Sequence, residues 1–227
     1  MANVITNPTN FQRRVSNYVR AMMYSSDVNY NGFTRVSFGA PAAANATLVS
    51  NAVSVANAGS VDLTNVAPFP ETYGRTATIV ASGAGGTGVV TLYGWDYLGQ
   101  PMRSDITLNG VTPVVIPKAY KSFMSLVSPG GMAGITVNIG SGANLGLPYK
   151  ALRVEWEVAN GAAVTVGTLT APVLTDPQTA TTGDPRGTYL PTTALNGTNI
   201  ISAAFDFAND VNTSNNGGLH GIQQYTA

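Results

Sequence analysis

The chain has 227 residues, which is enough for one large all-β domain or two small ones with a substantial hydrophobic core. Hydrophobic residues make up 44%, which excludes a largely disordered chain, yet only 10% of the residues are charged, well below the usual quarter. Eleven basic and eleven acidic side chains leave no net charge, so we expect a polar but uncharged surface that associates with neighbouring proteins.

Cysteine is absent, which excludes disulfides, thiolate metal sites and thiol nucleophiles. Residues 1–8 show neither a basic region nor a long apolar run, and no window of about 18 apolar residues occurs, so we expect no signal peptide and no membrane span. Residues 1–150 carry nine basic and five acidic side chains, whereas residues 151–227 carry two and six. This asymmetry favours contact between the two halves of neighbouring subunits, and neither half is basic enough to indicate nucleic-acid binding.

An N-terminal arm with a short helix is expected over residues 1–40. Apolar side chains recur at three- and four-residue intervals within residues 10–26, as in an amphipathic helix. Arg13, Arg14 and Arg20 lie off that apolar stripe. The helix either packs on its own domain or docks on a neighbouring subunit, in which case these arginines pair with an acidic surface. A strand is expected next, within residues 28–38.

Residues 41–171 are predicted to form a β-sandwich or barrel, because short strand patterns recur about every ten residues with Gly and Pro between them. The strands are expected at residues 76–81, 89–95, 104–108, 114–116, 121–127, 135–139, 152–158 and 163–169, with a weaker signal over 51–63. The Gly-rich stretch 82–88 lacks the Lys-Ser/Thr ending of a phosphate-binding P-loop and is interpreted as a hairpin loop.

The most regular alternation falls within residues 152–158. One face carries Leu152, Val154, Trp156 and Val158, and the other Arg153, Glu155 and Glu157. We therefore expect Trp156 to be buried as an anchor of the core. The two glutamates are interpreted as a solvated edge rather than a glycosidase-like carboxylate pair. Asn160-Gly161 predicts a type I′ turn after this strand.

Residues 172–227 are expected to form an extended C-terminal segment that lies along its own domain or along a neighbour, with one strand near residues 203–207. Leu219, Ile222 and Tyr225 are its candidate subunit-interface residues. His220, the only histidine, lies in a Gly-rich stretch that is unsuited to holding a catalytic imidazole.

Catalytic chemistry is not indicated, and we expect no enzyme activity, no cofactor and no metal site. A single histidine without cysteine leaves zinc short of its usual ligands, and no D-x-[DN]-x-[DN]-G calcium loop occurs. Trp95 and Tyr97 flank Asp96 in an aromatic turn. They form a candidate sugar-stacking platform, set against the alternative that they pack in the core or against a subunit.

Residues 93–113, YGWDYLGQPMRSDITLNGVTP, predict a strand, a turn at residues 99–101, a second strand and a tight turn at Asn109-Gly110. This block resembles a segment that recurs in virion proteins of tailed bacteriophages, among them β-rich capsid-decorating and tail proteins. Residues 184–191 and 217–222 resemble C-terminal segments of such proteins less specifically.

The resemblance implies a structural virion protein, made in the host cytoplasm, that decorates or cements the capsid through many modest contacts. Its implied partners are the major capsid protein or other virion subunits and copies of itself, with no nucleic acid and no membrane. One alternative is a neck, head-to-tail joining or tail-ring protein. A further alternative is a carbohydrate-binding receptor module.

Overall fold

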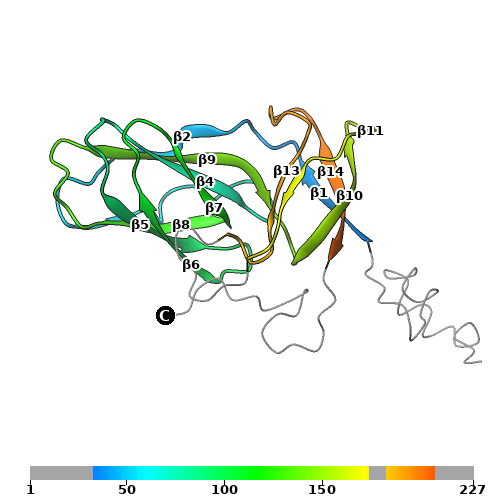
Figure 1. Cartoon of the computed structure of the whole chain (residues 1–227), viewed down its shortest axis with the longest axis horizontal. Helices are drawn as coiled ribbons and strands as arrows, with labels where there is room; N and C mark the ends of the chain where they lie inside the picture. The colour runs from blue at the N-terminus through cyan, green and yellow to red at the C-terminus, as the bar shows by residue number, and fades with distance from the viewer. Residues whose placement is uncertain (1–32, 174–182, 208–227) are drawn as a thin grey trace, which may run out of the picture.

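The computed structural model describes residues 33–173 and 183–207, which form fourteen β-strands and no helix (Figure 1). The predicted all-β class is therefore confirmed. The strands are β1 Phe33–Gly39, β2 Asn45–Ser54, β3 Gly59–Asp62, β4 Arg75–Ala81, β5 Val89–Trp95, β6 Pro101–Thr107, β7 Val114–Tyr120, β8 Ser122–Ser128, β9 Thr136–Gly146, β10 Ala151–Ala159, β11 Ala162–Val164, β12 Thr168–Thr170, β13 Thr188–Leu190 and β14 Ile201–Phe207. The expected helix with Arg13, Arg14 and Arg20 lies outside the described residues, as do Leu219, His220, Ile222 and Tyr225.

The strands form three antiparallel sheets, which we call A, B and C. Sheet A has the order β1-β14-β10-β11, and sheet C the order β3-β8-β5-β6. Sheet B has the order β12-β13-β9-β4-β7, with β2 also paired to β9. The sheets are curled and together form a half-barrel. In Figure 1, sheet A lies at one end of the molecule and sheet C at the other.

Two hydrophobic clusters hold the sheets together. The larger cluster lies between sheets B and C and includes Ile79, Leu92 and Ile139. The smaller cluster lies under sheet A and includes Phe205 and Leu145. The eleven-residue strand β9 contributes Ile139 to the first cluster and Leu145 to the second, so it runs through both.

Residues 82–88 connect β4 of sheet B to β5 of sheet C, so the expectation of a hairpin loop there is wrong, whereas two other turns follow their sequence signals. Asn160 and Gly161 both have positive φ, at 49° and 83°, as the predicted type I′ turn between β10 and β11 requires. The turn after β5 has Gly99 at φ 77°. Within β5, Gly94 is fixed by space instead, because a Cβ there would lie 2.3 Å from the Ser122 carbonyl oxygen and 2.8 Å from the Tyr120 ring.

The expectation that Trp156 anchors the core is wrong, since the residue is 40% exposed. Strand β10 pairs with β14 through two bulges, between Ala151 and Arg153 and between Val154 and Trp156. Each bulge inserts one residue, so their two reversals of facing cancel, and Ala151, Glu157 and Ala159 lie on the same buried face. Glu157 therefore points inward and is fully buried, which corrects the expectation of a solvated glutamate.

The chain divides differently from the expected arm, core and tail. Strand β1 is part of sheet A rather than of an arm, and it pairs with β14 along its length. Beyond residue 172, β13 joins sheet B, and β14 lies in the middle of sheet A between β1 and β10. Residues 183–207 are thus part of the folded body rather than an extended segment.

Candidate functional site

Of the two rings in the predicted sugar platform, Tyr97 is held by several contacts of its own. Tyr97 lies in the turn after β5, where its hydroxyl donates a hydrogen bond to the Pro148 carbonyl oxygen at 2.5 Å. Its ring packs edge-to-face against Tyr73, and the Arg186 guanidinium lies over it, 5.1 Å from the ring centroid. Burial raises the pKa of Tyr97 to about 12. Tyr97 is therefore held in place at its hydroxyl and its ring, while remaining partly exposed.

Trp95 shares a surface with Tyr93. Strand β5 alternates strictly, with Val90 and Leu92 in the core, so Tyr93 and Trp95 project from the outer face of sheet C, partly exposed. The residue opposite Tyr93 on β6 is Arg103, whose guanidinium binds both carboxylate oxygens of Asp105 at 3.0 and 2.8 Å. We call Tyr93, Trp95, Arg103 and Asp105 the aromatic face. The period-two pattern of β5 would have identified Tyr93 from the sequence.

A buried ionic cluster lies where the turn after β5 meets the segment before β13. Arg186 Nη2 lies 2.9 Å from Asp96 Oδ2, with the two side chains only 4% and 1% exposed. The two atoms are not aligned for a hydrogen bond, so the contact is electrostatic. Asp184 accepts hydrogen bonds from the backbone N–H groups of Ala119 and Arg186, and burial raises the pKa of its carboxyl. The cluster fastens residues 184–186 to the rest of the fold.

Lys118 on β7 belongs to the same region and is fully buried. Its ammonium donates a hydrogen bond to the Arg103 carbonyl oxygen at 2.9 Å. Burial lowers the pKa of Lys118 to about 8, although the carboxylates of Asp184 and Asp105 act in the opposite direction. A lysine in this position has a large share of neutral amine in mildly alkaline solution.

Glu157 forms a second buried polar centre, under sheet A. Its Oε2 accepts hydrogen bonds from the Tyr189 hydroxyl at 2.5 Å and from the N–H groups of Gly167 and Thr192 at 3.0 and 3.1 Å. Its Oε1 accepts one from the Thr193 N–H at 3.2 Å. Because four donors surround this carboxylate, it ties β10 to the chain around β13.

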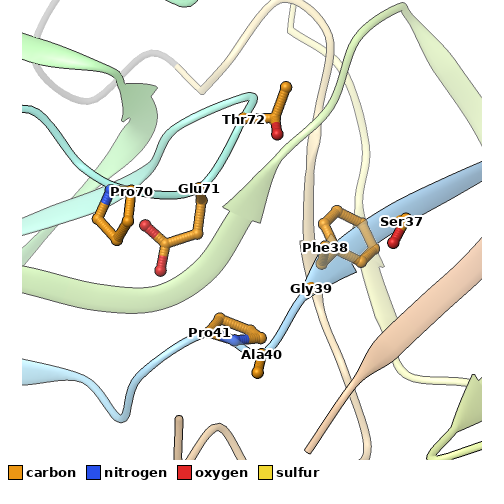
Figure 2. A pocket seen from close by; sticks show the side chains of 8 residues that line it. All are labelled: Ser37, Phe38, Gly39, Ala40, Pro41, Pro70, Glu71 and Thr72. Atoms are coloured by element: carbon orange, nitrogen blue, oxygen red, sulfur yellow. The ribbon is translucent and has the colours of Figure 1, made fainter. Parts of the chain in front are cut away.

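A pocket of about 460 Å³ lies at the C-terminal end of β1 (Figure 2). One wall consists of residues 37–41 and the other of residues 70–72. Phe38, Pro41 and Pro70 make part of the lining apolar, while Ser37 and Thr72 add hydroxyl groups. Glu71 extends from its wall toward the side of the pocket formed by Ala40 and Pro41. This is the candidate binding pocket of the described structure.

The distribution of charge is the most distinctive property of the described surface. The described residues include sixteen charged side chains, of which eight are buried: Glu71, Arg75, Asp96, Lys118, Glu157, Asp184, Arg186 and Asp206. Only Arg35, Asp62 and Arg153 are well exposed. Exposed large hydrophobic side chains are more numerous, namely Val61, Val89, Leu98, Val111, Val115, Met124, Leu152, Trp156, Val166, Leu190 and Ile200.

The comparisons with known proteins give no relative. No family model, no curated protein and no solved structure matches this chain. Within residues 33–173 and 183–207, no group of three or more His, Asp and Glu side chains is arranged to hold a metal ion. The same part of the chain contains no helix that is long and apolar enough to cross a membrane.

Proposed function

We propose that this chain is a structural protein of a tailed-bacteriophage virion that decorates or cements the capsid. Its partners in this proposal are the major capsid protein or other virion subunits and further copies of itself. The phage assignment rests on the resemblance of residues 93–113 to a segment of phage virion proteins. The assembly role rests on the scarcity of exposed charge among the described residues.

That scarcity favours burial of the surface against other proteins. Moving a charged side chain out of water is costly unless it finds a partner, so protein interfaces are depleted of charge at their centres. Only three of the sixteen charged side chains described are well exposed, whereas eleven large apolar ones are. A freely diffusing protein usually relies on exposed charge to avoid association, and this surface offers little of it.

The arrangement of the chain ends supports attachment to several neighbours at once. Phe33 of β1 pairs with Asp206 of β14, so residues 1–32 and 208–227 join the fold at adjacent positions on sheet A. Contacts made by the sheets and by both terminal segments would add together. When many copies attach to one lattice, modest individual contacts suffice for stable binding.

The test is association with capsids of the phage that encodes the chain. Purified protein is mixed with capsids that lack it, the particles are sedimented, and copies per particle are counted by quantitative mass spectrometry. Hundreds of copies support decoration, while about six or twelve would indicate a neck or tail ring, as expected from cyclic symmetry. A Val111→Lys, Ile200→Lys variant should bind less, and Thr64→Lys, at an exposed polar site, serves as the control. Absence of the chain from the particles would refute the proposal.

The aromatic face favours a second candidate function, a carbohydrate-binding receptor module. Tyr93 and Trp95 offer stacking surface next to the Arg103–Asp105 pair, a combination suited to a sugar with apolar and hydroxyl-bearing faces. Trp95→Ala and Tyr93→Ala should then abolish binding on a glycan array, whereas Tyr97→Phe should not. Unchanged glycan binding in the first two variants would rule out this face.

A further inference from the structure

Glu71, which lines the pocket at the end of β1, has a buried carboxylate oxygen whose hydrogen-bonding capacity is unused. The Glu71 side chain is 4% exposed, and its Oε1 accepts a hydrogen bond from Arg75 Nη1 at 2.9 Å. Its Oε2 is buried and has no hydrogen-bond partner among the described residues. A buried acceptor without a partner is unfavourable, so a ligand that enters the pocket with a donor group gains by satisfying it.

The charges around Glu71 determine what kind of donor suits the pocket. The Arg75 guanidinium already neutralises the carboxylate and also donates to the carbonyl oxygens of Gly142 and Ala42. The Lys121 ammonium lies at the backbone of the same loop, where it donates to the carbonyl oxygens of Phe69 at 2.6 Å and Glu71 at 2.7 Å. Two cations therefore accompany one carboxylate. A neutral or slightly acidic ligand with amide or hydroxyl donors fits better than a cation.

We propose that this pocket receives the C-terminal segment, residues 208–227, of a second copy of the chain. This inference rests on the proposed assembly function and names the contact between copies. The segment carries one charged residue, Asp210, and six Asn and Gln side chains that supply neutral donors. The other terminal segment, residues 1–32, carries three arginines against one aspartate and is less suited to a pocket that already holds two cations.

The proposed assembly role assigns the pocket to a second copy, and the position of the C-terminal segment on sheet A is compatible with this. Gly39, at the pocket, pairs with Ile201 at the start of β14, and β14 then runs away from the pocket to Phe207. The C-terminal segment thus begins at the end of the strand remote from its own pocket. Twenty residues span up to about 65 Å when extended, which is enough to reach the equivalent pocket of an adjacent subunit.

The experiment measures association of the intact chain and its competition by peptides. Sedimentation equilibrium is run on the wild-type chain, on Thr72→Trp, which fills the pocket from an exposed wall position, and on Thr64→Trp as the matched control. We expect Thr72→Trp to weaken self-association at least tenfold and Thr64→Trp to leave it unchanged. Synthetic peptide 208–227 should compete with self-association, and peptide 1–32 should not.

Glu71→Gln provides a second variant, whose folding is checked by circular dichroism before use. It retains a side-chain oxygen but replaces the other by a donor, so we expect weaker binding of peptide 208–227 in a folded protein. Self-association that Thr72→Trp leaves unchanged would overturn the inference while leaving the assembly function intact. The inference would also be overturned if the wild-type chain stayed monomeric and peptide 208–227 failed to bind it. If the chain were in addition absent from virus particles, the proposed function would fail together with the inference.

Discussion

Replacing Arg186 with methionine tests whether the buried ionic cluster holds the segment before β13 in place. The guanidinium lies 2.9 Å from the Asp96 carboxylate and over the Tyr97 ring, and both partners of the ion pair are almost completely buried. Arg186→Met keeps the apolar length of the side chain but leaves Asp96 without its ion-pair partner. Breaking a buried pair on one side costs about 3–5 kcal/mol, a large part of the roughly 5–15 kcal/mol that stabilises a typical protein.

The free energy of unfolding is measured by urea denaturation of the wild-type chain, Arg186→Met, Asp96→Asn and the double variant. Because each single change removes the same ion pair, the double-mutant cycle should give a coupling energy of about 1–3 kcal/mol. Arg153→Met is the control. Arg153 also forms ion pairs, with Glu155 and Asp206, but its side chain is 63% exposed, so its loss should cost less than about 1 kcal/mol. Equal losses for Arg186→Met and Arg153→Met, with no coupling, would refute the reasoning.

Three further predictions concern other parts of the fold. Burial lowers the pKa of Lys118 to about 8, so between about pH 8 and pH 10.5 the unfolded chain binds more protons than the folded one. The stability of the wild type relative to Lys118→Met should therefore rise with pH across that window. A difference that stays constant with pH in urea titrations would contradict this. Phe205→Ala in the core under sheet A should lower the free energy of unfolding by about 3–5 kcal/mol, whereas Trp156→Ser should lower it by about 1 kcal/mol or less. Thermal melts giving the opposite order would mean that Trp156, and not Glu157, faces the core. Gly94→Ala should destabilise the chain by about 1–3 kcal/mol, because the new Cβ meets the Ser122 carbonyl oxygen. Gly99→Ala is strained only by its positive φ and should cost about 1 kcal/mol. Equal unfolding midpoints for the two variants would show that sheet C shifts to accommodate the Cβ at position 94.

Local signals in the sequence are sufficient for several strands and turns of the central region, but not for the connection at residues 82–88, which joins two sheets. The alternation in residues 89–95 and the Asn160-Gly161 pair depend on interactions between near neighbours, and β5 and the turn between β10 and β11 lie where these patterns indicate. The same local pattern failed for Trp156. Which face of β10 lies against the core is decided by its pairing with β14, about fifty residues further along the chain, and not by its own alternation.

The buried charges were missed for a similar reason. The donors to Glu157 come from Gly167, Tyr189, Thr192 and Thr193, ten or more residues away, and no spacing in the sequence links them to it. Glu71 and Arg75 are four residues apart, but only the fold shows that both are enclosed. The uncharged surface, by contrast, was expected from composition. The fold reinforces it by enclosing half of the few charges that the described residues contain.

Strand β9 bears on how this protein can be dissected. Its first half supplies Val137 and Ile139 to one hydrophobic cluster and its last residues supply Leu145 to the other. Cutting the chain near either cluster removes side chains that the remaining fragment needs, so neither half can be excised as an autonomous unit. Calorimetry of the intact chain should accordingly record one endotherm, in which both clusters melt together.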